Sequence, residues 1–260
     1  MKIPTLTIQG EGQPFIWLHG MLDSVESDSV YSMIDFNRVS KVVSVIRYDA
    51  CGKSVAGDYS WAGMTNELLN LANHYKFEPM ILGGTSMGSG TAIHFTVRYP
   101  ERVKALILVT PPPAWGKRKG VKALYHKIAS KADQSGIPEF MRKLISMNTD
   151  VPDFFEQENP GTWERLLQFR LGFEPSYYPQ IYRGGAVSDL PAPKEIEKIK
   201  VPTLIAAFPD DLNHPFEMAQ TLNNLIAGSE MVIISNYADY RKFQEKVNNL
   251  VSSAFSDNKS

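Results

Sequence analysis

Residues 83–90, "GGTSMGSG", place the hydroxyl of Ser86 among glycines directly after an apolar run. Residues 84–88 fit the G-x-S-x-G pattern, in which a serine on a tight strand-to-helix turn is exposed as a nucleophile. Glycines suit such a turn because side chains would collide where it closes. The alternative is that Ser86 only caps the following helix. The strand-like "EPMILG" before it and the amphipathic "MGSGTAIHFTVRYP" after it favour a nucleophile.

The elements that would position this serine alternate along the chain. Short apolar runs predict strands in "PTLTIQ", "PFIWLH", 41–49, "PMILGG", 104–110, 201–208 and 230–235. Segments of helical period predict helices near 27–36, 62–76, 86–99, 216–227 and 239–255. This alternation predicts an α/β fold with a mostly parallel, doubly wound sheet that helices cover on both faces.

One long stretch interrupts the alternation. Residues 113–195 contain no convincing strand, and their segments have helical period, are rich in aromatic residues and are cut by Pro and Gly. We therefore expect a core formed by residues 1–112 and 196–260, with a helical cap or lid inserted over 113–195.

Four further motifs accompany the serine motif in a fixed order: "WLHG" (17–20), "RYDACGKS" (47–54), "RYPERVKALILVTPP" (98–112) and "VPTLIAAFPDDLNHP" (201–215). With these motifs the chain resembles the α/β-hydrolase superfamily over nearly its whole length. The resemblance implies the α/β-hydrolase fold, a nucleophilic serine and a cap that roofs the site and sets specificity.

The resemblance also implies the partners of the serine. Backbone N–H groups of Met87 and Met21 would form the oxyanion hole, since the family uses the residue after the nucleophile and one just after the His-Gly pair. The acid would come from "FPDDLNHP", which offers Asp210 and Asp211. The spacing D-x-x-x-P, with Pro215 as the proline, favours Asp211. The alternative is an aspartate that merely caps the next helix.

The base that a serine needs is missing from its usual place. The family carries a histidine just after the last strand, but this chain reads "IISNYADYRKF" there, with Ala238 or Asp239 at the corresponding position. Either a histidine at 238 or 239 was substituted, or one of the five histidines elsewhere in the chain replaces it, namely His19, His74, His94, His126 or His214.

Among these histidines, His214 follows Asp211 by three residues. It could bond to Asp211 or Asp210 and present its other nitrogen to Ser86. The alternative is that it packs against, or caps, the helix that Pro215 begins. We interpret His19 as shaping the oxyanion loop. His94, eight residues beyond Ser86 on the same predicted helix, would be about 12 Å away.

Composition excludes several other classes. The 260 residues carry 27 basic and 28 acidic side chains, so the protein has no excess of positive charge that could attract a nucleic acid or an anionic membrane. Cys51 is the only cysteine, which suits a reducing cytoplasm, and the N-terminus lacks the apolar stretch of a signal peptide. No metal-ligand cluster, P-loop or dinucleotide fingerprint is present, so we expect no cofactor and no metal.

The predicted function is hydrolysis of a small, modestly apolar carboxylic ester, lactone or thioester through an acyl-enzyme on Ser86. The partner would be a small molecule, acted on by a cytoplasmic enzyme. The alternative is a protein of the same fold that only binds a ligand, or a cofactor-free lyase or cyclase.

Overall fold

A seven-stranded sheet forms the centre of the protein. The structure is a computed structural model that describes residues 4, 6–54, 56–135, 139–147 and 151–255. The strands lie in the order β1-β3-β2-β4-β5-β6-β7, and only β1 runs antiparallel to its neighbour. Their bounds are Leu6–Gln9 (β1), Pro14–Leu18 (β2), Ser44–Tyr48 (β3), Met80–Thr85 (β4), Val103–Val109 (β5), Thr203–Ala207 (β6) and Glu230–Ile233 (β7). All seven coincide with strands expected from the apolar runs.

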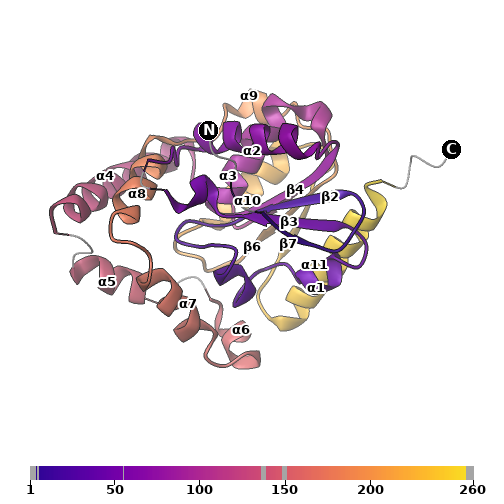
Figure 1. The fold of residues 1–260 in the computed structure, drawn as a ribbon. Helices are drawn as coiled ribbons and strands as arrows, with labels where there is room; N and C mark the ends of the chain where they lie inside the picture. Colours follow the sequence, from indigo (N-terminus) through magenta and orange to yellow (C-terminus); the bar gives the residue numbers. More distant parts are fainter. Residues whose placement is uncertain (1–3, 5, 55, 136–138, 148–150, 256–260) are drawn as a thin grey trace.

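Helices cover both faces of the sheet (Figure 1). One layer contains α2 (Trp61–Tyr75), α3 (Met87–Arg98), the short α9 (Pro193–Ile196) and α10 (Phe216–Leu225), and the opposite layer contains α1 (Phe36–Val39) and α11 (Tyr237–Ser253). Alternate residues of one strand therefore enter two different cores: Leu106 and Leu108 of β5 face the first layer, and Ala105 and Ile107 the second. This double burial explains the unbroken apolar runs and confirms the predicted α/β fold.

The helix expected over residues 27–36 is wrong. This segment holds only a 3-10 turn, Ser27–Ser29, and α1 begins at its very end. Side chains here bond to the local backbone: Ser32 Oγ accepts from the N–H of Ile34 at 3.1 Å, and Asp35 Oδ1 accepts from the N–H of Arg38 at 3.0 Å. Such bonds compete with those of a continuous helix.

Between β5 and β6 the chain forms a group of helices at one side of the sheet, on the left in Figure 1. The bounds of these helices are Arg118–Ser135 (α4), Glu139–Ser146 (α5), Asp153–Glu158 (α6), Thr162–Leu171 (α7) and Tyr177–Val187 (α8), and the 3-10 turn Trp115–Lys117 precedes them. Two further 3-10 turns, Ala50–Lys53 and Pro100–Arg102, lie earlier in the chain. No strand occurs among the described residues of this group. Its division from the core as a cap over 113–195 stays a prediction.

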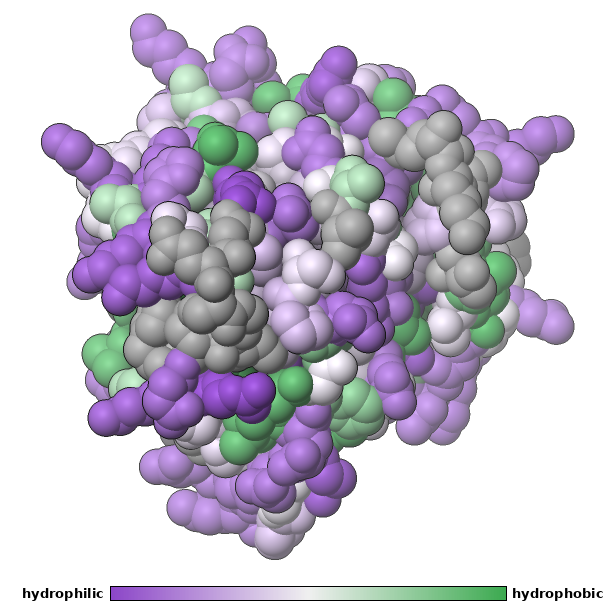
Figure 2. Space-filling model, turned by 60° about the vertical axis from the view of Figure 1, so that its left-hand side comes forward, coloured by the Kyte–Doolittle hydropathy of each residue, from purple (hydrophilic) through white to green (hydrophobic). Residues whose placement is uncertain are grey.

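The side that carries this helical group is largely hydrophilic, with small apolar clusters in its lower half (Figure 2). Leu124 of α4 and Met147, which directly follows α5, are both about half exposed. None of the described helices is long and apolar enough to cross a membrane.

Candidate active site

Ser86 lies on the turn between β4 and α3, where the sequence motif predicts it. Its backbone is left-handed, with φ 49° and ψ −111°, and its N–H donates to the carbonyl of Val109 at 3.0 Å. A Cβ on Gly88 would come within 2.1 Å of the Leu18 carbonyl oxygen, and one on Gly84 within 2.5 Å of the backbone of Gly88. The two glycines are therefore required for the close approach of β2, β4 and α3 that holds the serine in this strained conformation.

Ser86 lies at one end of a chain of hydrogen bonds with the predicted histidine and acid. His214 Nε2 is 2.8 Å from Ser86 Oγ, and His214 Nδ1 is 2.8 Å from Asp211 Oδ2. A carboxylate only accepts hydrogen bonds, so Nδ1 carries the ring hydrogen and Nε2 accepts from the serine hydroxyl. The arrangement gives the imidazole the tautomer in which it can take up the proton of Ser86.

Two backbone hydrogen bonds hold the Asp211 side chain in place. Its Oδ1 accepts from the N–H groups of Asn213 at 2.8 Å and His214 at 3.0 Å, and its side chain is only 6% exposed. Asp210, the alternative acid, is exposed. The N-cap of α10 is Pro215, and no side chain caps this helix, so Asp211 and His214 do not serve as its cap.

Met87 follows Ser86 in the chain, and Met21, the other predicted oxyanion donor, lies on a different loop. Met87 is the first residue of α3, so its N–H has no acceptor within the helix. Met21 lies in the loop after β2 and lines the same cavity as Ser86. His19, which precedes this loop, bonds through Nδ1 to the Gly20 carbonyl at 2.8 Å and accepts from the N–H of Ala50 at 3.0 Å. It thus tethers the loop, in line with its predicted structural role.

The other histidines lie in different surroundings. His94 Nε2 bonds to the carbonyl of Asp189 at 2.7 Å, while His74 and His126 are exposed.

At the family's usual histidine position, Asp239 lies in the first turn of α11. Its N–H donates to Asn236 Oδ1 at 3.0 Å, and its carboxylate accepts from Asn236 Nδ2 at 2.9 Å. The residues after the last strand here form a helix cap.

The single cysteine is no competing nucleophile. Cys51 Sγ donates to the Asp58 carbonyl at 3.4 Å. Burial and the nearby carboxylate of Glu67 raise the pKa of Cys51 to about 12, so the thiolate is scarce at neutral pH.

Ser86, His214 and Asp211 line a cavity of about 330 Å³, which we call the serine cavity. Its walls come from the loop after β2, from β4, from the loop after β6 and from the helical group, and include Met21, Leu22, Tyr125, Ile128, Ile145, Tyr182 and Phe208. Leu124, Met147 and Leu212 also line it and are exposed, Leu212 by 86%. Exposed apolar side chains therefore form part of the mouth of the serine cavity, beside the exposed Asn213.

An ion pair that the sequence did not suggest joins the loop after β2 to the helical group. Arg170 of α7 contacts Asp23 Oδ1 through Nη2 at 2.9 Å and Nε at 3.3 Å. Both residues line the serine cavity, and Asp23 lies against Gly20, where an added Cβ would come within 2.6 Å of its Oδ2. In the sequence, Arg170 stands out only as a lone charge within the largely apolar stretch "LLQFRLGF". Its partner Asp23 lies 147 residues away, so the sequence does not indicate the pairing.

We expect Arg170→Met to lower the free energy of unfolding by about 3 kcal/mol, because it leaves the Asp23 carboxylate poorly solvated and without this partner. Chemical denaturation of Arg170→Met, Asp23→Asn and the double variant measures the coupling. Lys198→Met, which removes an exposed ion pair with Glu195, is the control and should change stability by less than about 0.5 kcal/mol. Additive effects of the two cavity substitutions would contradict the pairing.

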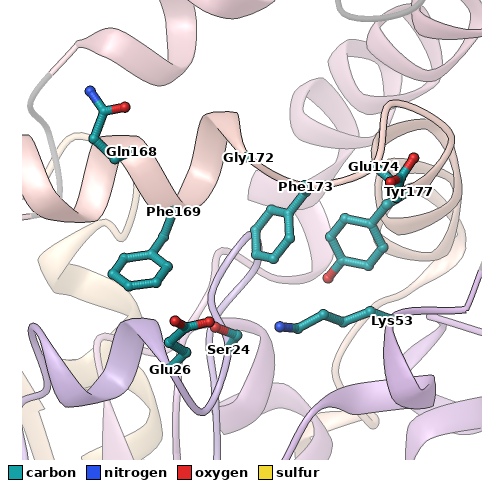
Figure 3. A pocket seen from close by; sticks show the side chains of 9 residues that line it. All are labelled: Ser24, Glu26, Lys53, Gln168, Phe169, Gly172, Phe173, Glu174 and Tyr177. Carbon is teal, nitrogen blue, oxygen red and sulfur yellow. The ribbon is translucent and has the colours of Figure 1, made fainter.

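A second cavity has a volume of about 450 Å³, and Figure 3 shows the residues that line it. It is lined by Ser24 and Phe169, the chain neighbours of Asp23 and Arg170, so the ion pair lies at the boundary of the two cavities. In Figure 3 the ammonium group of Lys53 lies below Phe173, and Nζ is 5.3 Å from the centre of that ring. Lys53 also pairs with Asp49 at 3.1 Å.

No group of three or more His, Cys, Asp and Glu side chains among the described residues has an arrangement that could hold a metal ion.

Comparisons with known proteins agree with the fold. The model of a family described as alpha/beta hydrolase fold matches residues 13–126. AB hydrolase superfamily protein YisY of Bacillus subtilis is 28% identical over 255 residues, which cover 94% of this chain and 91% of that protein. Proline iminopeptidase of Lactobacillus acidophilus is 26% identical, covering 94% and 89%. The structure of a thermophilic esterase from Thermogutta terrifontis superposes with a TM-score of 0.80 at 20% identity, covering 95% and 93%.

Proposed function

The chain belongs to the α/β-hydrolase superfamily and is a hydrolase, and we propose that it cleaves a small, modestly apolar carboxylic ester, lactone or thioester through an acyl-enzyme on Ser86. The observation that carries this proposal is the continuous hydrogen-bond chain from Asp211 Oδ2 through His214 to Ser86 Oγ, with 2.8 Å at both contacts.

In the first half of the proposed reaction, Ser86 Oγ attacks the carbonyl carbon while its proton passes to His214 Nε2. The backbone N–H groups of Met87 and Met21 stabilise the negative charge that develops on the carbonyl oxygen, and each such donor contributes about 3 kcal/mol in known enzymes. The protonated imidazole then gives its proton to the leaving alcohol or thiol, and the acyl group stays on Ser86.

In the second half, a water molecule gives its proton to His214 and attacks the acyl carbon. The proton returns to Ser86 Oγ as the carboxylic acid leaves. Asp211 keeps the ring in one orientation through both halves and stabilises the imidazolium that forms twice in each cycle.

The proposed substrate class rests on the serine cavity. Its exposed rim of Leu124, Met147 and Leu212 suits an apolar acyl or alcohol group. A volume of about 330 Å³ suits a small substrate rather than a long chain. Since α4, α5 and α7 contribute part of the wall, we also propose that residues 113–195 act as a cap over Ser86.

A fluorophosphonate probe and a p-nitrophenyl ester of a short acid test the proposal together. We expect stoichiometric labelling, and peptide mapping that finds the adduct on Ser86, because His214 activates only this hydroxyl. Ser89 is the internal control: its hydroxyl donates to the carbonyls of Gly84 at 2.7 Å and Val109 at 2.9 Å and should stay unlabelled. A native protein with neither labelling nor ester hydrolysis would overturn the proposal and favour a protein that only binds its ligand.

A further inference from the structure

One acidic side chain in the serine cavity has no role in the proposed hydrogen-bond chain. Asp28 lines this cavity and is only 7% exposed. Within the described part of the chain, its backbone N–H donates to the Ser24 carbonyl at 2.9 Å, but its carboxyl has no hydrogen-bond or ion-pair partner. A buried polar group without a protein partner lowers the free energy of unfolding, and a bound ligand that forms hydrogen bonds with the group would offset this loss.

The segment that carries this acid is held rigidly. Ser24 and Ser27 bond reciprocally, each backbone N–H to the other's Oγ, at 2.8 and 3.1 Å. The N–H of Val25 donates to Asp49 Oδ1 at 2.9 Å, and its carbonyl accepts from Arg47 Nη1 at 3.3 Å. These bonds fix the backbone of the segment, so the unpartnered carboxyl is held in place at the cavity wall; the nearby Arg47 Nε is also buried without a hydrogen-bond partner among the residues that the structure describes.

The charge state of Asp28 follows from its neighbours. Burial raises its pKa well above the ordinary value, the Asp23 and Asp49 carboxylates raise it further, and only the Arg47 guanidinium opposes them. The shift favours the neutral form of the carboxyl, which can donate one hydrogen bond and accept others.

We propose that Asp28 is a specificity-determining residue that binds a neutral oxygen-bearing group, a hydroxyl or a carbonyl, on the acyl or alcohol part of the substrate. The inference rests on the proposed function, because it assigns a substrate class to the same site. Asp23 and Arg170, both on the wall of this cavity, pair with each other at 2.9 Å, so their charges offset each other and favour neither an anionic nor a cationic substituent. A neutral oxygen avoids the cost of burying an unpaired charge.

The test compares matched esters. We would measure kcat/KM for p-nitrophenyl butyrate and its 3-hydroxy, 3-oxo and 3-amino analogues, and for propyl and 3-hydroxypropyl butyrate. We expect that a hydroxyl or oxo group on the acyl part, or a hydroxyl on the alcohol part, raises kcat/KM about fivefold over the unsubstituted ester. A factor of this size corresponds to one hydrogen bond. Asp28→Asn, which keeps a donor and an acceptor, should retain this ratio, and Asp28→Leu should abolish it.

Glu26→Leu is the matched control, because Glu26 lies two residues earlier in the same segment but lines the second cavity. It should retain the wild-type ratio. A preference that survives in Asp28→Leu, no preference in the wild type, or a preference for the ammonium ester would each overturn the inference. Fluorophosphonate labelling of Ser86 in the wild type reports the proposed function separately, so a labelled enzyme without the oxygen preference refutes only the role of Asp28. Circular dichroism verifies the fold of each variant.

Discussion

His214→Ala is expected to lower kcat for ester hydrolysis by at least about 10⁴-fold, with a smaller effect on KM. His214 Nε2 contacts Ser86 Oγ at 2.8 Å in the intact protein, and among the described side chains no other hydrogen-bond partner of this hydroxyl would remain to accept its proton. Nucleophilic attack would then have to proceed from an unactivated hydroxyl. Steady-state kinetics on a p-nitrophenyl ester, together with the rate of fluorophosphonate labelling, measures the loss.

Two further variants separate this effect from a general need for histidine. His126→Ala changes an exposed residue of α4 and should keep kcat within about twofold of the wild type. Asp239→His, added to His214→Ala, places a histidine near the family's usual position but should restore nothing, because residue 239 belongs to the first turn of α11. Recovery of activity in this double variant would show that the base acts from the loop after β7 instead.

The sheet and the serine turn could be predicted from the sequence because their signals are local. Each strand is buried on both faces and therefore reads as a continuous apolar run, such as "KALILVT" for β5. The glycines around Ser86 are required by backbone contacts at 2.1 and 2.5 Å, and only glycine meets that requirement. The segment 27–36 was mispredicted because serine and aspartate side chains there bond to the nearby backbone.

The roles of His214 were left open by the sequence because the direction of an imidazole depends on the conformation of its loop. One signal was available in "DLNH": an aspartate whose side chain accepts from the backbone two and three residues later is typical of an Asx turn. This turn brings residue 214 back toward residue 211. Contacts such as Asp23 with Arg170 had no such signal, because they join segments 147 residues apart.

Asp211→Asn is expected to lower kcat by about 10⁴-fold while leaving the fold intact. Asp211 Oδ1 accepts from the N–H groups of Asn213 and His214. An asparagine would keep these two bonds through its side-chain oxygen, so its amide nitrogen would take the position of Oδ2 and face His214 Nδ1. The amide donates, so Nδ1 would become the acceptor and the ring hydrogen would move to Nε2. The ring would then present a hydrogen to Ser86 Oγ and could not take its proton.

Asp210→Asn is the matched control for this tautomer argument, because it makes the same chemical change one residue earlier, at an exposed carboxylate. It should alter kcat by less than about twofold. The kcat of both variants and their rates of fluorophosphonate labelling give the comparison, and thermal unfolding verifies that each is folded. Equal losses in the two variants would mean that the negative charge of the loop, rather than the orientation and tautomer of His214, sets the activity of Ser86. A loss confined to Asp211→Asn assigns the effect to the single oxygen that contacts Nδ1 at 2.8 Å.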